Sequence, residues 1–402
     1  MIEVTKTLNV NLSPLTARKK DLLAELEKKW LQSEKHLFET LLNWDGFSED
    51  THLTRFNLHG FEYGHIKADT KMQSQLVEDL IRDVFASWQN HGRNGITTAS
   101  VSYNIPRSGD FKVTRRNNPV ISLATFNGHG RTAVPISQDG AWERFKDHLR
   151  QGWKTTSFKL KRNGDGWHLL FSVKKEFTVK DTYNGVVGVD IGSRTLASVS
   201  VLDKEGTIKR QLYLGRDVWE KQRNINIRRS LLFSFADKGS YKARCKLHRL
   251  RGYEERFVKT RCYEVAHRVV DLAVKYDSFI AIEDLNGLRW SKLHRKANRR
   301  VKRMPYNLFR IILEQVATEN SIKVVAVKSA HTSQICSHCG EIHKTSGVLY
   351  KCFSCGFVCN RDRNASVNIA HRAGVRFFNL CHLKHLPAYD GKCPGQRARL
   401  AT

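Results

Sequence analysis

The chain has 402 residues, enough for two or three domains with sizeable cores, and a formal net charge of +29. Its nine cysteines, spread over a chain of this length, favour a reducing compartment over a disulfide-stabilised scaffold. The first residues, MIEVTKTLNVNL, do not form a charged leader followed by an apolar block, and no apolar run approaches about 18 residues. We therefore expect neither a secreted nor a membrane-spanning protein.

The positive charge is concentrated in one part of the chain. Residues 1–100 hold 12 Lys and Arg against 14 Asp and Glu, a balance of −2, whereas residues 101–402 have a balance of +31. A basic region of this size favours polyanions and is too large for a simple localisation tag. Nucleic acid is the expected partner.

The first hundred residues predict a strand and a small helical lobe. Residues 3–12 alternate as a strand does, and residues 13–44 follow as a helix with Ser13 or Thr16 as its candidate cap. Residues 72–91 predict a second helix with one apolar face. The members of that face are Leu76, Val77, Leu80, Ile81, Val84, Phe85 and Trp88.

The region from about residue 98 to 180 predicts β-structure. The segments TTASVSYNIP, PVISLATF, TSFKLKR and GWHLLFSVKKEF read as strands, and turn sequences such as RSGD and RNGDG separate them. We expect a β-barrel-like domain that can include the first strand of the chain. Trp88 and Phe126 are candidates for stacking on nucleic-acid bases, although such aromatic residues more often belong to a core.

After about residue 184 the pattern becomes α/β, and acidic residues stand at the ends of apolar segments. NGVVGVDIG is an apolar strand that ends at Asp190, and SFIAIED is another that ends at Glu283 and Asp284. Further on, NRDRNASVNIA places Asp362 just before an apolar-periodic helix. Taken singly, Asp190 reads equally well as a turn residue and Asp362 as a helix cap.

Together these acids point to a metal site. Carboxylates that face one another at buried strand ends are costly unless a cation holds them. Two Mg²⁺ ions bridged by such carboxylates can activate water and stabilise the leaving oxygen of a phosphodiester.

The densest basic block is RWSKLHRKANRRVKR, residues 289–303, which contains no acid. It reads both as a solvated loop and as a phosphate-contacting segment, and the two interpretations are compatible. The candidate nucleic-acid contacts in it are Arg289, Lys292, Arg295, Lys296, Arg299, Arg300, Lys302 and Arg303.

Two CxxC pairs, separated by twelve residues, predict a zinc ribbon. The four thiolates suit Zn²⁺ in tetrahedral coordination, with Zn–S distances of about 2.3 Å. The predicted ligands are Cys336, Cys339, Cys352 and Cys355. Gly340 and Gly356 directly follow the two pairs, where a knuckle needs a permissive backbone. A full set of protein ligands leaves no position for substrate, so we expect the zinc to be structural.

Further cysteines lie near this motif. Cys359 is an additional candidate ligand, although a free buried thiol is the simpler interpretation. In the C-terminal tail, Cys381, His382, His385 and Cys393 are a conceivable second site, which their irregular spacing argues against.

In order, the motifs GVDIGSRTLAS, IEDLNGL, HTSQICSHCG with its second CxxC pair, and NRDRNASVNIA resemble those of TnpB. This is the family of transposon-associated RNA-guided nucleases, related to miniature type V CRISPR effectors. The resemblance covers roughly residues 184–375, and upstream it is only architectural. One departure is Ser366, where many relatives have alanine.

The resemblance implies a multidomain α/β plus β-barrel protein. Its parts would be an RNase H-like RuvC nuclease domain with an inserted zinc ribbon, an N-terminal wedge barrel and a helical recognition lobe. Asp190, Glu283 and Asp362 would be the catalytic, magnesium-binding carboxylates, and Asp284 would not be a ligand.

The resemblance also implies domain boundaries. The expected ranges are a wedge strand at 1–12, a helical recognition lobe at 13–97, a wedge β-barrel at 98–183, RuvC segments at 184–324 and 361–380, the zinc ribbon at 325–360, and a C-terminal tail at 381–402.

The implied function is RNA-guided cleavage of double-stranded DNA beside a short target-adjacent motif, in one Mg²⁺-dependent site. The partners would be a guide RNA and target DNA, with one or two protein copies per guide, no membrane, and a cytoplasmic, prokaryotic location at the nucleoid. Three alternatives remain: a nuclease-silent RNA-guided repressor, a DNA transposase with an RNase H-like core, and a non-enzymatic zinc-ribbon binding protein. The three acids in the order Asp, Glu, Asp argue against each of them.

Overall fold

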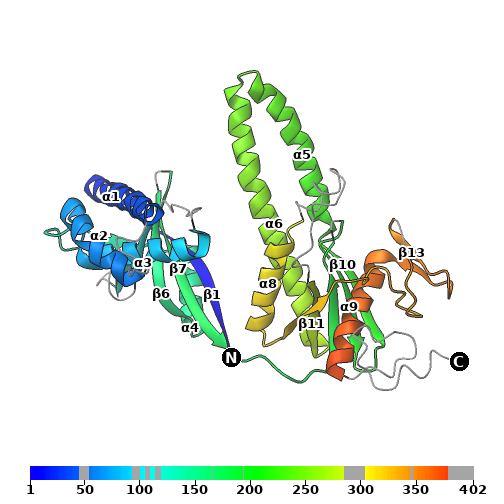
Figure 1. The fold of residues 1–402 in the computed structure, drawn as a ribbon. Helices are drawn as coiled ribbons and strands as arrows, with labels where there is room; N and C mark the ends of the chain where they lie inside the picture. The colour runs from blue at the N-terminus through cyan, green and yellow to red at the C-terminus, as the bar shows by residue number, and fades with distance from the viewer. Residues whose placement is uncertain are drawn as a thin grey trace. The chain divides into compact units, whose positions relative to one another are not determined.

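The computed structural model describes residues 1–44, 54–92, 100–104, 109–113, 119–164, 166–192, 194–284, 304–344 and 347–378. The chain forms two compact units (Figure 1). One spans Glu3–Glu176, and the other combines Met1–Ile2 with Phe177–Thr402. The predicted basic block at 289–303 and the tail cysteines and histidines at 381–393 lie outside the described residues.

Three helices form the helical part of the N-terminal unit: α1 (Ala17–Leu42), α2 (Arg55–Thr70) and α3 (Ser74–His91). The apolar face predicted for α3 is buried from Leu76 to Phe85, whereas Trp88 is only half-buried. α2 was not predicted from the sequence, because it has no clear apolar face: only two of its apolar side chains, Leu58 and Ile66, are buried. Thr54 caps it by accepting a hydrogen bond from the backbone N–H of residue 57.

The strands of this unit form two sheets. The first has the order β1-β7-β6-β2, with β1 (Ile2–Asn11), β7 (Gly166–Phe177), β6 (Lys154–Asn163) and β2 (Ser100–Asn104). The second has the order β3-β4-β5, with β3 (Gly109–Val113), β4 (Pro119–Ala124) and β5 (Arg131–Pro135). An antiparallel bridge between Leu12 and Ile136 connects the ends of β1 and β5. The first strand of the chain therefore joins the later strands, and closure into a barrel stays a prediction.

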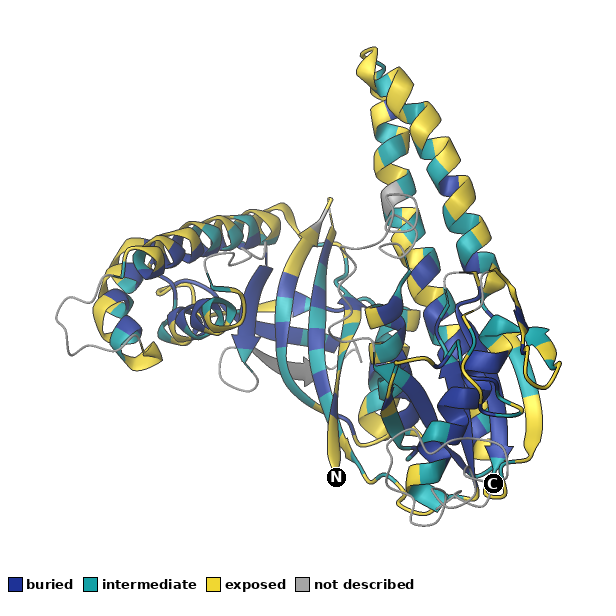
Figure 2. Cartoon of the chain, turned by 45° about the vertical axis from the view of Figure 1, so that its right-hand side comes forward, coloured by how far each residue is buried: buried dark blue, intermediate teal, exposed yellow. Residues whose placement is uncertain are grey.

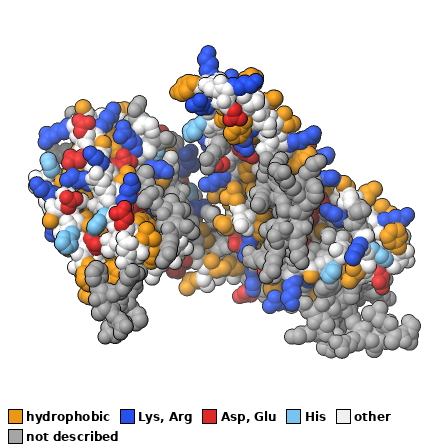
Figure 3. Space-filling view, turned by 45° about the horizontal axis from the view of Figure 1, so that its top comes forward, with side chains coloured by type: hydrophobic (Ala, Val, Ile, Leu, Met, Phe, Trp, Pro, Cys, Tyr) orange, Lys and Arg blue, Asp and Glu red, His pale blue; other side chains and the backbone are white. Residues whose placement is uncertain are grey.

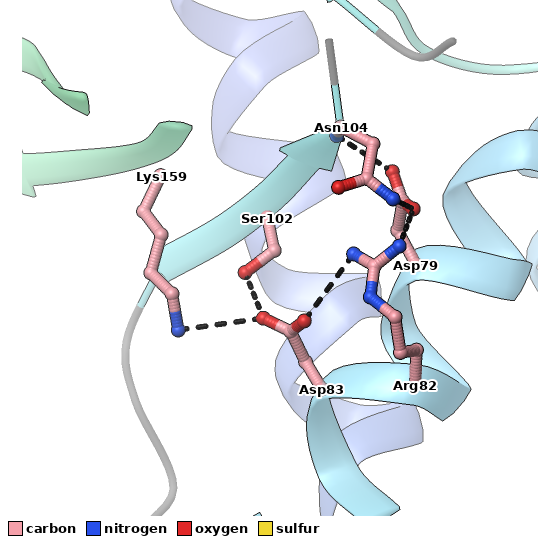
Figure 4. A network of polar contacts seen from close by, with 6 residues as sticks. All are labelled: Asp79, Arg82, Asp83, Ser102, Asn104 and Lys159. Atoms are coloured by element: carbon pink, nitrogen blue, oxygen red, sulfur yellow. Dashed lines mark hydrogen bonds and ion pairs between the residues drawn. The ribbon is translucent and has the colours of Figure 1, made fainter. Parts of the chain in front are cut away.

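A polar network attaches β2 to α3 (Figure 4). The carboxylate of Asp79, 2% exposed, accepts hydrogen bonds from the backbone N–H and the Nδ2 of Asn104 at 3.0 and 2.9 Å. Arg82 pairs with Asp79 at 2.8 Å, and Asp83 accepts a hydrogen bond from the Ser102 hydroxyl. The buried carboxylate of Asp79 is tolerated here because Asn104 and Arg82 donate to it. The same unit also contains α4 (Gly140–Arg150), capped by Asp139.

A five-stranded sheet forms the core of the C-terminal unit, in the order β10-β9-β8-β11-β12. The strands are β8 (Gly185–Asp190), β9 (Ala197–Asp203), β10 (Ile208–Leu214), β11 (Ser278–Asp284) and β12 (Val324–Lys328). β8, β9 and β10 are antiparallel, whereas β11 pairs in parallel with both β8 and β12. The carboxyl ends of β8 and β11 therefore lie at the same edge.

Helices cover both faces of this sheet (Figure 1). On one face, α6 (Tyr241–Lys275) and α8 (Tyr306–Glu319) pack on side chains such as Val187 and Ile280. On the other face, α9 (Arg361–Phe378) packs on Val186 and Phe279. Both faces are buried, which explains why β8 and β11 read as continuous apolar runs.

Gly188 permits the close approach of α9 to β8. A Cβ atom at this position would lie 2.2 Å from the carbonyl oxygen of Ser366 and 2.7 Å from the Cβ of Ala370. No side chain fits at those distances, so the glycine sets how near the helix comes to the sheet.

Two further elements extend from the sheet. α5 (Arg216–Asp237) forms a long antiparallel hairpin with α6. Figure 2 shows that most of the outer part of this hairpin is exposed. β13 (Leu349–Lys351) and β14 (Val358–Asn360) form the small hairpin of the cysteine ribbon. None of the helices in the described part of the chain has a stretch that is long and apolar enough to cross a membrane.

Candidate active site and metal centre

The three carboxylates singled out in the sequence line one cavity of about 510 Å³. Asp190 is the last residue of β8, Glu283 the penultimate residue of β11, and Asp362 lies in the first turn of α9. In the parallel pairing of β8 and β11, Ile282 lies opposite Val189, so the two acids that follow these residues are neighbours. The structure thus brings together residues from three separate parts of the chain. Asp284 is not among the described residues that line this cavity.

The carboxylates repel one another electrostatically. Burial raises the pKa of Asp190 well above its usual value, and the charges of Glu283 and Asp362 raise it further. The Arg361 guanidinium acts in the opposite direction. Mg²⁺ binds oxygen ligands that carry concentrated negative charge, so the three carboxylates fit a hard divalent cation.

Hydrogen bonds hold Glu283 in place. The Thr332 hydroxyl donates to its Oε1, and the Tyr306 hydroxyl donates to its backbone oxygen at 2.6 Å. Burial raises the pKa of this carboxyl, while the Thr332 hydrogen bond and the charge of Arg372 lower it. The fixed carboxylate therefore points into the cavity in one orientation. Thr332 was not predicted from the sequence, where its place just before the first CxxC pair is the sole signal of its role.

The four predicted cysteine ligands form a cluster in which all four sulfur atoms lie within 4.8 Å of one another. The Sγ atoms of Cys336 and Cys355 are 3.7 Å apart, and those of Cys339 and Cys352 are 3.5 Å apart. A tetrahedral site with Zn–S bonds of about 2.3 Å requires sulfur–sulfur distances of about 3.8 Å. The cluster therefore has the size of a tetrahedral metal site and not of a disulfide, whose sulfur atoms lie about 2 Å apart.

The two CxxC pairs form matching knuckles. Gly340 and Gly356 have φ values of 82° and 73°, the left-handed conformation that glycine adopts readily. Each glycine donates its N–H to the carbonyl of the first cysteine of its pair, at 2.9 and 3.1 Å. Burial opposes thiolate formation at Cys352, but hydrogen bonds from the Cys355 N–H and from Cys339 lower its pKa to about 6. Cys359 packs beside the cluster without belonging to it, and burial raises its pKa to about 11.

Two buried asparagines of α9 connect the ribbon to the helix that carries Asp362. Asn364 is 0% exposed; its Oδ1 accepts from the Ser337 N–H at 2.9 Å and its Nδ2 donates to the Ile335 oxygen at 2.6 Å. One turn later, the Nδ2 of Asn368 donates to the oxygens of Thr332 and Ile335, both at 2.8 Å. These bonds fix the segment that enters the first knuckle. The sequence signal was two asparagines four residues apart on a helix whose buried residues include Ala365, Val367 and Ile369.

Ser366, the departure from the usual alanine, is also buried and has a partner. Its hydroxyl lies 2.6 Å from that of Ser200 and donates to the Arg363 oxygen at 2.9 Å. Gln211 donates to Ser200 at 3.0 Å. The polar replacement is therefore accommodated by a polar partner on β9.

Several parts of the chain are similar to known proteins. Residues 306–369 match the model of the Cas12f1-like TNB domain. Among curated proteins, the chain is 27% identical over 221 residues to the CRISPR-associated endodeoxyribonuclease Cas12f2 of Micrarchaeota archaeon, covering 52% of this chain and 40% of that relative. It is 24% identical over 228 residues to the TnpB-like protein MJ0751 of Methanocaldococcus jannaschii, covering 54% of this chain and 79% of the relative.

Two further matches extend over most of the chain. The CRISPR-associated endodeoxyribonuclease Cas12f1 of Sulfoacidibacillus thermotolerans is 24% identical over 379 residues, covering 81% of this chain and 86% of the relative. A Cas12f1-sgRNA-target DNA complex contains a chain of similar fold, with a TM-score of 0.63, 16% identity and coverage of 88% of this chain and 83% of that one. Together with the ribbon, these matches show that the chain is similar to TnpB proteins and miniature type V effectors.

Proposed function

We propose that the chain is an RNA-guided DNA endonuclease that hydrolyses phosphodiester bonds in a single RuvC-type site. The convergence of Asp190, Glu283 and Asp362 on one cavity carries this proposal. The mixed sheet with helices on both faces supports an RNase H-like core. A silent repressor would not need these three acids, and their order, Asp, Glu, Asp, argues against a transposase, whose usual order ends in Glu.

The cavity residues have distinct parts in the proposed chemistry. Asp190, Glu283 and Asp362 would hold Mg²⁺, which when bound supplies an acidified water and stabilises charge on the departing oxygen. Arg194 and Arg361 line the same cavity and offer positive charge to the scissile phosphate. At Gly192, a Cβ atom would lie 3.0 Å from the Thr195 oxygen and 4.0 Å from Asp362 Oδ2, so a side chain there would crowd the carboxylate.

The ribbon would position one of these carboxylates. A zinc ion bound by the four cysteines would fix the knuckle that contains Ser337, and Asn364 and Asn368 would transmit that position to the start of α9. The backbone N–H of Arg361, one residue before Asp362, also donates to the Val348 oxygen of the ribbon at 2.8 Å. The zinc would thus serve the nuclease as a structural clamp.

The partners follow from the relatives and from the charge. Cas12f proteins are named CRISPR-associated endodeoxyribonucleases, and the similar solved structure is a complex with guide RNA and target DNA. A net charge of +29 suits both ligands. We assign guide RNA and double-stranded DNA as partners, with one or two protein copies per guide RNA. The wedge and recognition regions within residues 1–183 would recognise the target-adjacent motif. The block 289–303 is assigned to phosphate contacts.

The test begins with purification of the chain from cells that also express its flanking locus, followed by sequencing of the RNA that copurifies. The same preparation, with Mg²⁺, is then given a plasmid library carrying a guide-matched target beside randomised bases. A discrete RNA, together with cleavage that is lost in Asp190→Ala, is the expected result. Binding without cleavage would indicate the silent repressor, and the lack of any defined RNA would overturn guided recognition.

A further inference from the structure

The outer part of the α5–α6 hairpin is strongly basic. Residues 221–253 contain ten Lys and Arg and a single acid, Asp237. The base of the hairpin is different, because Asp217 pairs there with Arg261 at 2.8 Å, and Val258 and Cys262 are buried in the core of the sheet domain. The outer part thus needs a separate explanation.

A cavity of about 530 Å³ lies between the two helices in this basic region. Its lining comprises Lys221, Asn224, Ile225 and Arg228 of α5 and Lys246, Arg249, Leu250 and Tyr253 of α6. The lining includes four cations and no acid. Its volume falls within the range of about 300–1,000 Å³ that is usual for small-molecule and cofactor sites.

The cations of this cavity are not neutralised by the protein. Arg228, Lys246 and Arg249 are exposed, and no carboxylate of the described residues lies within ion-pair distance of them. The neighbouring Arg229, by contrast, pairs with Glu254. Like charges on facing helices destabilise the hairpin slightly, and a bound anion would relieve this repulsion.

The cavity also has an apolar side. Ile225 is 5% exposed at its base, Leu250 is half-buried, and Tyr253 is 41% exposed. The ammonium of Lys221 lies 5.4 Å from the centroid of the Tyr253 ring. Cations beside an aromatic ring and an aliphatic floor match a nucleotide, which combines a phosphate with a flat, largely apolar base.

The same combination continues to the end of the hairpin. Phe233, Phe235 and Tyr241 are 51%, 57% and 76% exposed, and Lys238 and Lys242 stand close to them in the chain. Figure 3 shows blue Lys and Arg side chains beside orange hydrophobic ones at this end. A surface that repeats cations and aromatic rings over several turns suits a strand of nucleic acid better than a single small anion.

We propose that the cavity between α5 and α6 binds an unpaired nucleotide of a nucleic-acid strand. Arg228, Lys246 and Arg249 hold the flanking phosphates, and the base lies against Leu250 and Tyr253. This inference rests on the proposed function for the choice of nucleic acid as the ligand. A duplex hides the faces of its bases, so the site favours single strands over double-stranded nucleic acid.

The test measures binding of oligonucleotides to the nucleic-acid-free full chain in an Asp190→Ala background, where cleavage cannot interfere. The probes are a twelve-nucleotide RNA, the DNA of the same sequence, and the corresponding duplex, at a series of salt concentrations. The double variant Arg228→Gln/Arg249→Gln should weaken single-strand binding at least about fivefold. It should also reduce the slope of log affinity against log salt by about 1.4, since each lost phosphate contact on a single strand contributes about 0.7.

The matched control removes the same charge from the same hairpin, outside the cavity. Lys259→Gln/Arg268→Gln, two exposed positions of α6, should leave single-strand affinity close to that of the Asp190→Ala parent. If both double variants weaken binding equally, the effect is one of overall charge, and the proposed site is wrong. Equal losses for RNA and DNA indicate recognition of phosphate and base, whereas a loss confined to one of them identifies the strand that the site takes.

Base contact has its own readout. A 2-aminopurine base in the single strand should lose fluorescence on binding through stacking on Tyr253, and Tyr253→Leu should abolish this quenching while Tyr253→Phe retains it. Thermal unfolding of each variant shows whether it has folded. Quenching unchanged in a folded Tyr253→Leu variant overturns the base contact.

The outcomes separate this inference from the nuclease proposal. If guided cleavage occurs and depends on Asp190 but the cavity variants bind single strands as their parent does, the cavity inference fails and the nuclease stands. If no cleavage is found but the Arg228→Gln/Arg249→Gln variant loses strand binding, the cavity stands and the nuclease fails.

Discussion

At the scale of single residues, the candidate site depends on groups that are small or uncharged as much as on the acids. Gly188 sets the distance between α9 and β8, and Thr332 orients Glu283. Neither contributes to the chemistry directly. Each decides where a carboxylate lies.

Substituting Gly188 by alanine should destabilise the C-terminal unit strongly. The added Cβ would overlap the Ser366 backbone, and overpacking of this kind costs about 3 kcal/mol of unfolding free energy, or more where backbone must shift. The midpoint of urea denaturation measures the effect. Gly60→Ala, in an open position of α2, is the matched control and should be neutral or slightly stabilising. Similar midpoints for the two variants would refute this account of the α9 packing.

His371 should make the stability of the protein depend on pH. Burial lowers its pKa from 6.5 to about 4, and its Nε2 has no hydrogen-bond partner among the described residues. Between these pH values the unfolded chain binds a proton that the folded chain does not, so stability is full above about pH 6.5 and falls as the pH drops towards 4. The loss attributable to this residue approaches roughly 3 kcal/mol at the acidic end.

Chemical denaturation of His371→Leu at several pH values tests this expectation. The variant should show a weaker loss of stability between pH 6.5 and 4 than the parent. Ser366→Ala, which leaves His371 in place on the same helix, should keep the parental pH dependence. Parallel curves for the parent and His371→Leu would contradict the prediction.

At the scale of elements, α9 connects the two sites. Its first turn carries Asp362, its next turns carry Asn364 and Asn368, and its inner face packs on the sheet. The proposed role of the helix is to transmit the position of the cysteine ribbon to the cavity. These asparagines are the hydrogen-bond partners of the Thr332 and Ile335 carbonyl oxygens and of the Ser337 N–H.

The double variant Asn364→Ala/Asn368→Ala should uncouple the ribbon from the nuclease. Each lost bond leaves a buried backbone group unsatisfied, at a cost of about 1–3 kcal/mol. Guided cleavage should fall roughly 10- to 100-fold, because a small displacement of a metal-binding carboxylate slows the reaction by such factors. Zinc content should change little.

Ser366→Ala is the control on the same helix. It removes the hydrogen bond between the side chains of Ser366 and Ser200 and leaves both asparagines intact. Ser200 keeps the hydrogen bond that Gln211 donates to it. Cleavage at the parental rate is expected. A variant lacking both asparagines that still cleaves at the parental rate would show that the ribbon does not position Asp362.

At the scale of the whole molecule, metal binding should act on one unit and leave the other unaffected. The four cysteines and the three acids all belong to the C-terminal unit, whereas the helices and sheets of Glu3–Glu176 have their own core. Loss of zinc should therefore loosen the ribbon without unfolding the N-terminal unit.

Cys352→Ser tests this separation. The variant should lose bound zinc and most guided cleavage, although no catalytic acid is removed. Limited proteolysis should show new cleavage sites in the ribbon and none in the N-terminal unit. Cys359→Ser, beside the cluster but outside it, should keep zinc and activity. Unchanged zinc content and cleavage in Cys352→Ser would overturn the proposed role of the ribbon.

The sequence by itself determined the features that depend on short stretches of chain. The spacing of the CxxC pairs predicted a four-cysteine cluster, and apolar runs placed Asp190 and Glu283 at strand ends. Local periodicity also identified the buried face of α3 from Leu76 to Phe85. Such patterns can be read directly, because neighbouring residues in a strand, a helix or a knuckle have fixed geometric relations.

Only the tertiary structure decided the rest. It showed that Asp362 reaches the other two acids because Gly188 admits α9, and that Asn364 and Asn368 bind the ribbon. It also revealed α2 and the cavity of the α5–α6 hairpin, which have few buried apolar residues and hence no clear periodic signal. These features arise from contacts between distant segments, and local propensity does not encode which segments meet.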